Sequence, residues 1–229
     1  VGSAKNFIRV GHFLNAPLPG GDKAVLEPWR FALSLLFETF GKEKALELAR
    51  MLWTKREKML EPLLRNMGMY VKTSSAGRLF DAAASILGLR DVVSYDAQAA
   101  IELEAMAKGK GCAPFDIKDE GSHLLLDWRP AIEWLMEGLN RKGKKQLAAG
   151  FHDGLATALV EVSKKIASQT GIRHVALSGG VWQNKRLLSV TFALLKKEGL
   201  EPLAHKNTSP NDECISLGQV AVGIAYWSN

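Results

Sequence analysis

Cysteine is scarce in this sequence, and its placement excludes two kinds of structure. Cys112 and Cys214 are the two cysteines among 229 residues, and they lie far apart rather than in C-x-x-C spacing. A disulfide framework or a structural zinc site needs more cysteines at closer spacing, so we expect neither. Thiols in such a chain are typical of cytoplasmic proteins, and we expect a cytoplasmic location.

Long apolar runs are also missing. The sequence has no run of about 20 apolar residues that could span a membrane, and no signal-peptide pattern. Hydrophobic residues still make up 47% of the chain and charged residues 24%, which is enough to bury a sizeable core. We therefore expect a globular protein without a membrane partner. Because the sequence opens on Val1 rather than on methionine, we also expect a piece of a longer protein.

Standard metal and nucleotide motifs are absent as well. The histidines stand at positions 12, 123, 152, 174 and 205, and no two of them form H-x-x-x-H or H-E-x-x-H. The dinucleotide fingerprint G-x-G-x-x-G and the P-loop pattern do not occur either. These absences exclude a metal site made from histidines close in sequence. His152 falls in a predicted long helix, where a buried, hydrogen-bonded histidine is the expected role.

Positive charge is in excess but spread along the chain. The net charge is +6 and the sequence pI is about 9.3, which permits an acidic partner without requiring one. The densest basic run, at 141–145, predicts a solvated loop, with an RNA contact as the alternative. Nucleic acid is therefore not an expected partner.

Helical patterns dominate the first two thirds of the sequence. Apolar residues at helical spacing predict helices over 27–36, 42–52 and 55–66, which form a module that ends near Gly68. Further helices are predicted over 77–87, 96–108, 129–139 and 151–169. Residues 73–75 can cap the first of these, and Asp127 can cap the third. One strand is expected at 122–126.

The last third of the sequence changes to an α/β pattern. A short buried strand at 174–177 is followed by a turn and a helix at 184–198. A second strand at 202–205, a polar loop and a helix at 215–227 complete the pattern. Strand–helix–strand order predicts two parallel strands.

The turn between the first strand and its helix contains Gly179 and Gly180. Glycines there let the backbone approach a phosphate or a ribose, and the following helix start favours anions. A tight strand-to-helix turn without a ligand is an equal alternative.

Three polar side chains have both a functional and a structural interpretation. Asp81 could accept hydrogen bonds from a ribose, but an ion pair with Arg78 on the helix surface is commoner. Asn184 could contact a base, although spacing favours a helix cap. Asp212 could ligate a metal, but a cap of the last helix is favoured by spacing.

Several blocks, in one order along the chain, resemble the C-terminal part of the HypF carbamoyltransferases, which mature [NiFe]-hydrogenases. The resemblance covers essentially the whole chain. The blocks are residues 18–22, 27–30, 73–82, 94–104, 151–152, 178–184, 211–212 and 215–219.

This resemblance implies an α/β fold, namely the second lobe of the actin/Hsp70/sugar-kinase (ASKHA) architecture with a helical insertion. Residues 1–22 would be a linker from the first lobe, 23–70 the helical insertion, and 71–229 the C-terminal nucleotide-binding lobe. Asp212 would join two upstream histidines in binding a divalent metal ion (Mg²⁺, Zn²⁺ or Fe²⁺). No catalytic residue is assigned, and the implied nucleotide-binding residues are Gly77, Asp81, Gly179, Gly180 and Asn184.

The resemblance also implies a reaction in steps. Carbamoyl phosphate is cleaved, ATP is used to form carbamoyl-adenylate, and the carbamoyl group passes to the C-terminal cysteine of HypE for cyanide synthesis. Since the first lobe with its paired histidines is missing, we expect this piece alone to have no transferase activity and little metal affinity.

Two departures leave alternatives open. Glu213 and Cys214 stand where the family usually has two glycines, and Asp96-Ala97 stands where Glu-Gly is usual. The chain could instead belong to an O-carbamoyltransferase or a tRNA threonylcarbamoyl-transfer relative, or be a non-catalytic module for nucleotide binding or docking. The block at 182–184 and the block at 18–22 argue against the other two transferases.

Overall fold

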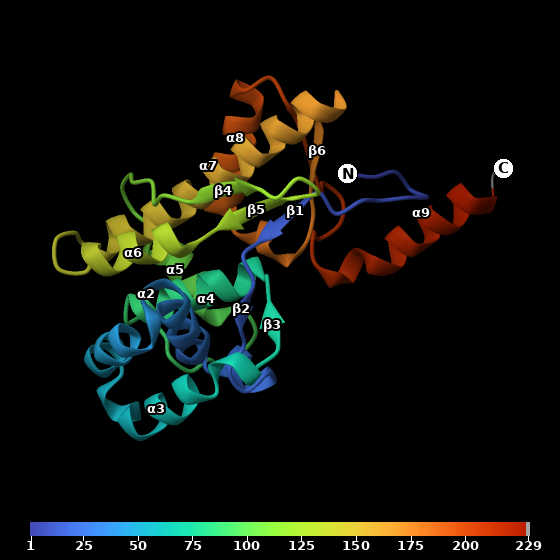
Figure 1. Cartoon of the computed structure of the whole chain (residues 1–229). Helices are drawn as coiled ribbons and strands as arrows, with labels where there is room; N and C mark the ends of the chain where they lie inside the picture. The colour runs from blue at the N-terminus through green and yellow to red at the C-terminus, as the bar shows by residue number, and fades with distance from the viewer. Residues whose placement is uncertain (228–229) are drawn as a thin grey trace. The chain divides into compact units, whose positions relative to one another are not determined.

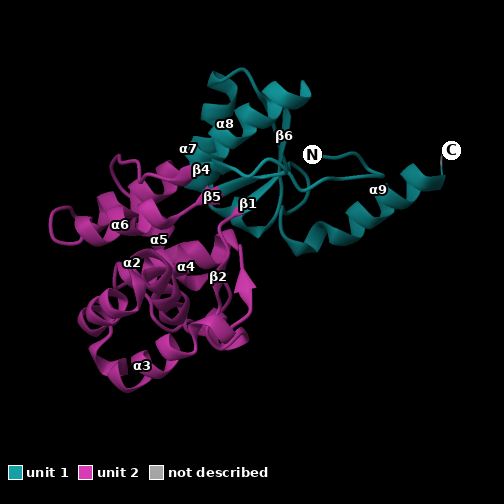
Figure 2. Ribbon diagram, in the orientation of Figure 1, with its two compact units in different colours: residues 1–12, 117–125, 156–229 teal, residues 13–116, 126–155 magenta. Residues whose placement is uncertain are grey.

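The computed structural model describes residues 1–227, coloured along the chain in Figure 1. These residues form two compact units, coloured separately in Figure 2. Unit 1 comprises residues 1–12, 117–125 and the chain from 156 onward. Unit 2 comprises residues 13–116 and 126–155.

Unit 2 is mainly helical. A short antiparallel pair, β2 (Ala16–Pro17) with β3 (Lys72–Thr73), brackets its first helices. Between them lie α1 (Asp22–Leu26), α2 (Pro28–Leu52), α3 (Glu57–Arg65) and the short 3-10 turns at Thr54–Arg56 and Met67–Met69. The later helices are α4 (Ala76–Ile86), α5 (Gln98–Met106) and α6 (Arg129–Gly138).

The core of unit 2 forms where α2 and α4 pack together. Phe80 of α4 meets the ring of Phe151 edge-on, with centroids 5.5 Å apart. His152 is fully buried, and its Nδ1 lies 2.7 Å from the Ala148 carbonyl, which confirms the expected structural histidine. Apolar residues dominate this core, among them Trp29, Phe31, Leu33, Leu35, Leu36, Leu79, Phe80, Ile132 and Leu135.

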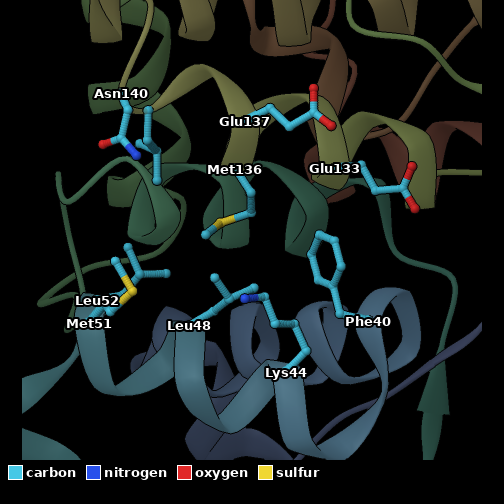
Figure 3. Close-up of a pocket in the computed structure, with 10 residues that line it drawn as sticks. Phe40, Lys44, Leu48, Met51, Leu52, Glu133, Met136, Glu137 and Asn140 are labelled. Carbon is cyan, nitrogen blue, oxygen red and sulfur yellow. The ribbon is translucent and has the colours of Figure 1, made fainter.

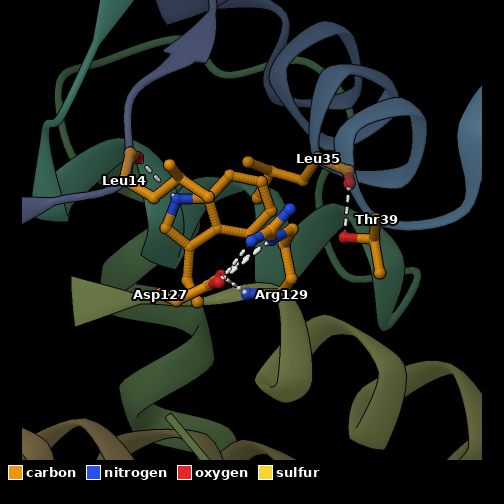
Figure 4. A network of polar contacts seen from close by, with 6 residues as sticks. Leu14, Leu35, Thr39, Asp127 and Arg129 are labelled. Carbon is orange, nitrogen blue, oxygen red and sulfur yellow. Dashed lines mark hydrogen bonds and ion pairs between the residues drawn. The ribbon is translucent and has the colours of Figure 1, made fainter. Parts of the chain in front are cut away.

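A polar network crosses the same core (Figure 4). The buried Asp127 carboxylate accepts a hydrogen bond from the backbone N–H of Arg129 at 3.0 Å and pairs with its guanidinium. The indole N–H of Trp128 donates to the Leu14 carbonyl at 2.7 Å. The expected cap by Asp127 needs correction, because Trp128 is the N-cap of α6 and no side chain caps the helix; Asp127 instead accepts from the N–H of the first helical residue, Arg129.

Unit 1 contains the parallel strands β6 (His174–Leu177) and β7 (Glu201–Ala204), joined through α8 (Lys185–Lys197). Their register pairs His174 with Glu201 and Leu177 with Ala204, so the parallel pairing predicted from the sequence is confirmed. The small apolar core consists of Val160, Leu177, Leu195 and Leu200.

The last helix of unit 1, α9 (Ile215–Trp227), is apolar and exposed. Leu217, Val220 and Ile224 recur at helical spacing and are each more than half exposed. Single exposed apolar side chains are ordinary, but a whole exposed apolar face is typical of an interaction site. No helix among the described residues is long and apolar enough to span a membrane.

The residues of four elements are divided between the units. They are β1 (Gly11–Phe13), β4 (Asp116–Asp119), β5 (Leu124–Asp127) and α7 (Lys144–Thr170). The three strands form a sheet in the order β1-β5-β4. The expected division into 1–22, 23–70 and 71–229 runs along other lines than these units and stays a prediction.

Several sequence predictions need correction at the ends of elements. The two helices expected at 27–36 and 42–52 are both present within α2, on either side of a kink at Gly41, whose φ of 76° is not helical. Helix α7 begins at Lys144 rather than at 151, so the last two residues of the basic run are helical. The strands β1 and β4 were not predicted, because their short segments lack a sustained alternation of apolar residues.

Close packing of α7 yields a stability prediction. A Cβ added at Gly154 would overlap the backbone of Ala113, whose N–H donates to the Gly150 carbonyl at 2.9 Å. We expect Gly154→Ala to lower the free energy of unfolding by about 2 kcal/mol or more, although alanine favours helices by about 1 kcal/mol. Gly223→Ala in α9, which meets no atom within 4 Å, is the matched control and should cost nothing. Denaturant unfolding gives both values, and a Gly154→Ala variant as stable as the parent would contradict the packing argument.

Candidate nucleotide site

The glycine turn follows directly from the end of β6. Gly179 has a φ of +103° and a ψ of 155°, a conformation that L side chains rarely adopt. Its N–H donates to the Pro210 carbonyl at 2.7 Å, which ties the turn to the polar loop after β7. Gly180 opens the 3-10 helix η3 (Gly180–Gln183), and both glycines are exposed. Glycine is therefore required at 179 by backbone conformation, whereas nothing in the backbone requires it at 180.

A cavity of about 410 Å³ lies beside this turn, within unit 1. The turn contributes Ser178 and Gly179, and the loop after β7 contributes His205, Asn211 and Asp212. Carboxyl ends of adjacent parallel strands meet at one edge of a sheet, where α/β proteins bind their ligands. The structure thus brings together the glycine turn and Asp212, two candidates that lie more than thirty residues apart in the sequence.

The structure corrects the helix-cap interpretation of Asp212. The side chain that caps the turn η4 (Asp212–Cys214) belongs to Asn211, whose Oδ1 accepts from the N–H of Glu213 at 3.1 Å. Asp212 is exposed, and its carboxylate makes no hydrogen bond or ion pair with any described residue. Asn211 takes the cap because its backbone, at ψ −165°, is extended.

Asn184 has the structural role that spacing favours. Its Oδ1 accepts from the N–H of Leu187 at 2.9 Å, which makes it the N-cap of α8. A contact between Asn184 and a nucleotide stays a prediction.

Gly77 and Asp81 belong to α4 of unit 2, whereas the residues described above belong to unit 1. Ser75 caps this helix by accepting from the N–H of Arg78 at 3.4 Å. A Cβ added at Gly77 would meet only the Ser75 hydroxyl, at 3.7 Å, so the protein itself leaves space on this side of the helix.

Asp81 is 3% exposed, so the expected surface ion pair is in fact largely buried. Its carboxylate lies 2.9 Å from Arg78 Nη1. Burial raises the pKa of Asp81 to about 6; Arg78 opposes this rise, and the negative charge of Asp96 adds to it. Burying the Asp81 carboxylate costs free energy of folding, and Gly77 leaves space one helical turn away. Asp81 is therefore a candidate functional group.

Sequence reasoning missed the role of His205. Its Nε2 lies 3.1 Å from Ser178 Oγ, next to the glycine turn. The one signal for this pairing is that Ser178 directly follows the first predicted strand and His205 is the last residue of the second.

Metal ligands are sparse. Among residues 1–227 no group of three histidine, cysteine or acidic side chains is placed to hold a metal ion. Asp212 therefore belongs to no such group within this part of the protein, and neither Cys112 nor Cys214 forms a disulfide there.

A second cavity, of about 270 Å³, lies in unit 2 between the latter part of α2 and α6 (Figure 3). Phe40, Leu48 and Met136 supply apolar walls, and Lys44 and Glu133 are among the charged residues that line it. None of the predicted site residues lines it, so it is not the candidate nucleotide site.

A parallel strand pair with a glycine turn after one strand and a polar loop after the next is an arrangement at which open α/β proteins bind ligands. The chain matches, over residues 1–219, the family described as "Carbamoyltransferase, Kae1-like Domain, second subdomain". It belongs to this family.

Named relatives agree with this assignment. The chain is 36% identical over 217 residues to the carbamoyltransferase HypF of Rhizobium leguminosarum bv. viciae, covering 93% of this chain and 27% of that protein. It is 33% identical over 235 residues to HypF of Synechocystis sp., covering 94% and 30%. The chain therefore spans less than a third of the length of these relatives.

Solved structures show the same fold. A crystal structure of full-length HypF in the phosphate- and nucleotide-bound form matches with a TM-score of 0.86 and 29% identity, over 99% of this chain and 30% of that one. HypF of T. kodakarensis matches with a TM-score of 0.84 at 24% identity, over 98% of this chain and 31% of that one. The ASKHA-type fold expected from the resemblance is confirmed.

The buried Asp81 predicts a pH dependence of stability. Its pKa is about 6 in the folded chain against 3.8 ordinarily, so the folded state binds the proton more tightly. Stability from this group is present below about pH 4 and is lost as the pH rises to about 6. Between pH 4 and pH 6 the free energy of unfolding of the parent should fall because of this group. In Asp81→Asn, which cannot ionise, the fall should be smaller by up to about 3 kcal/mol. Urea unfolding at intervals from pH 4 to 7 measures this, and identical slopes for variant and parent would refute the raised pKa.

Proposed function

We propose that this chain is the second lobe of a HypF-type transfer site, which uses carbamoyl phosphate and ATP to carbamoylate the C-terminal cysteine of HypE. The observation that supports this most is the family match over residues 1–219, with the glycine turn and Asp212 in one cavity. A HypF structure with nucleotide and phosphate bound has the same fold.

The proposed chemistry assigns a different task to each part of the site. Adenylation turns the carbamoyl group into an acyl phosphate with a good leaving group, AMP. Negative charge develops as the cysteine thiolate attacks the carbamoyl carbon, and backbone N–H groups at the glycine turn can stabilise anionic oxygens. Gly77 and Asp81 would hold the ribose, and Asn184 would contact the nucleotide.

A divalent metal ion, when bound, would neutralise charge on the phosphate and carbamoyl oxygens. Asp212 suits this role, because its exposed carboxylate faces the cavity without a protein partner. A single carboxylate is an incomplete ligand set for Mg²⁺, Zn²⁺ or Fe²⁺. We therefore propose that the remaining ligands come from the first subdomain, and that the chain alone binds metal weakly.

The exposed apolar face of α9 agrees with a lobe that works together with another part. The matched family is described as a second subdomain, which implies a first. Ile215 and Leu217 of α9 also line the glycine-turn cavity. A first subdomain packed on α9 would therefore lie beside that cavity as well.

The alternatives are less well supported. A tRNA N6-adenosine threonylcarbamoyltransferase of Prochlorococcus marinus is 29% identical over only 61% of the chain. The HypF relatives match over 93–98% of it at 31–36% identity. A non-catalytic docking module has no observation in its favour beyond the replacement of two glycines by Glu213 and Cys214.

Nucleotide binding at the glycine turn is tested with Gly180→Ala. The added Cβ would meet only Asn211 Cβ, at 3.9 Å, so the variant should fold like the parent. It should lower the affinity for ATP and for AMP at least tenfold in calorimetric titration, because a phosphate at the turn would meet the new methyl group. Asp81→Ala should also lower the affinity for ATP and for AMP, if Asp81 holds the ribose. Unchanged binding by Gly180→Ala would contradict phosphate binding here.

The transferase role is tested in a chimera. This chain replaces the corresponding region of Synechocystis HypF, and addition of a carbamoyl group to HypE is followed by intact mass. We expect transfer in the chimera and none with this chain alone. A chimera that binds ATP and melts at the parent temperature, yet leaves HypE unmodified, would favour the docking alternative.

A further inference from the structure

A chain of hydrogen bonds leads from the loop after β7 to the glycine turn. Thr208 Oγ1 lies 2.9 Å from His205 Nδ1, and His205 Nε2 lies 3.1 Å from Ser178 Oγ. Ser178 directly precedes Gly179, and all three side chains line the cavity that also contains Asp212. The imidazole therefore connects the ends of the two parallel strands at the place where a phosphate would bind.

The hydrogen bonds among Thr208, His205 and Ser178 can be arranged in two ways, which differ in where the protons lie. A neutral imidazole carries one N–H, so it donates through one nitrogen and accepts through the other. If Thr208 donates to Nδ1, then Nε2–H donates to Ser178 Oγ, and the serine O–H is available to the cavity. In the reverse arrangement Ser178 donates to Nε2, and only its lone pairs face the cavity.

An anionic oxygen in the cavity distinguishes the two arrangements. It accepts a hydrogen bond from the serine hydroxyl in the first and is repelled by the serine lone pairs in the second. Which ring nitrogen of a histidine carries the proton is set by the bond that the other nitrogen makes. Thr208 is the partner that can supply a proton to Nδ1 and so hold the first arrangement.

We propose that His205, held by Thr208, is a positioning residue that keeps the Ser178 hydroxyl as a donor to a phosphate oxygen of the nucleotide. This proposal rests on the proposed binding of phosphate at the glycine turn. His205 acts through Ser178 and does not itself touch the nucleotide.

A merely structural role for His205 is the competing explanation. Hydrogen bonds between exposed side chains contribute little to folding, so removal of the imidazole should barely change stability. The same strand pair offers a matched control. His174, at the other end of β6, is exposed and lies 2.9 Å from Glu201, away from the cavity.

The experiment is a calorimetric titration of the whole chain with ATP and with inorganic tripolyphosphate. His205→Ala should lower the affinity for both ligands about tenfold, and Thr208→Val should lower it less. His205→Gln, which keeps a donor near the position of Nε2, should recover most of the loss. His174→Ala should bind like the parent, and all variants should melt at the parent temperature.

A double-mutant cycle separates positioning from other effects. In a Ser178→Ala background, His205→Ala should cost no further affinity, because the hydroxyl that it positions is gone. An undiminished effect in that background, or parent-like binding by His205→Ala alone, overturns the proposal. If Gly180→Ala lowers the affinity for ATP while His205→Ala does not, only the proposed role of His205 fails. If the parent chain binds neither ligand, phosphate binding at the turn fails together with it.

Discussion

Parallel pairing of β6 with β7 is the constraint on which the candidate site depends. The register places Leu177 beside Ala204, so the segments after both strands emerge at the same edge. The glycine turn, His205 and the loop with Asp212 all follow from this placement. The hydrogen bond from Gly179 to the Pro210 carbonyl then holds the turn and the loop together. A slip of the register would separate every one of these groups.

The candidate residues of unit 2 centre on a buried charge. Asp81 is buried in α4, and Arg78 compensates only part of the cost of burying its carboxylate. A purely structural helix would be more stable with an apolar residue there. Such a cost agrees with a role in ligand binding, and Gly77 leaves space one turn away. The proposed ribose contact gives a reason for both residues.

The family assignment and the surface of the chain agree on how the lobe is used. The chain belongs to a family described as a second subdomain, and it spans less than a third of the HypF relatives described above. An apolar, exposed α9 and a lone carboxylate at Asp212 are both features of an incomplete site. Both features agree with our proposal that the remaining groups come from a first subdomain.

The sequence by itself determined the local elements and the family resemblance. The strand at 174–177, the parallel order and the cap at Asn184 depend on short-range periodicity and hydrogen bonds, which spacing reveals. Tertiary structure alone decided that Asn211 rather than Asp212 is the cap, that Asp81 is buried, and that His205 meets Ser178. These outcomes depend on backbone angles and on contacts between residues distant in sequence. Local pattern carries no information about them, because burial and pairing arise only when separate segments pack.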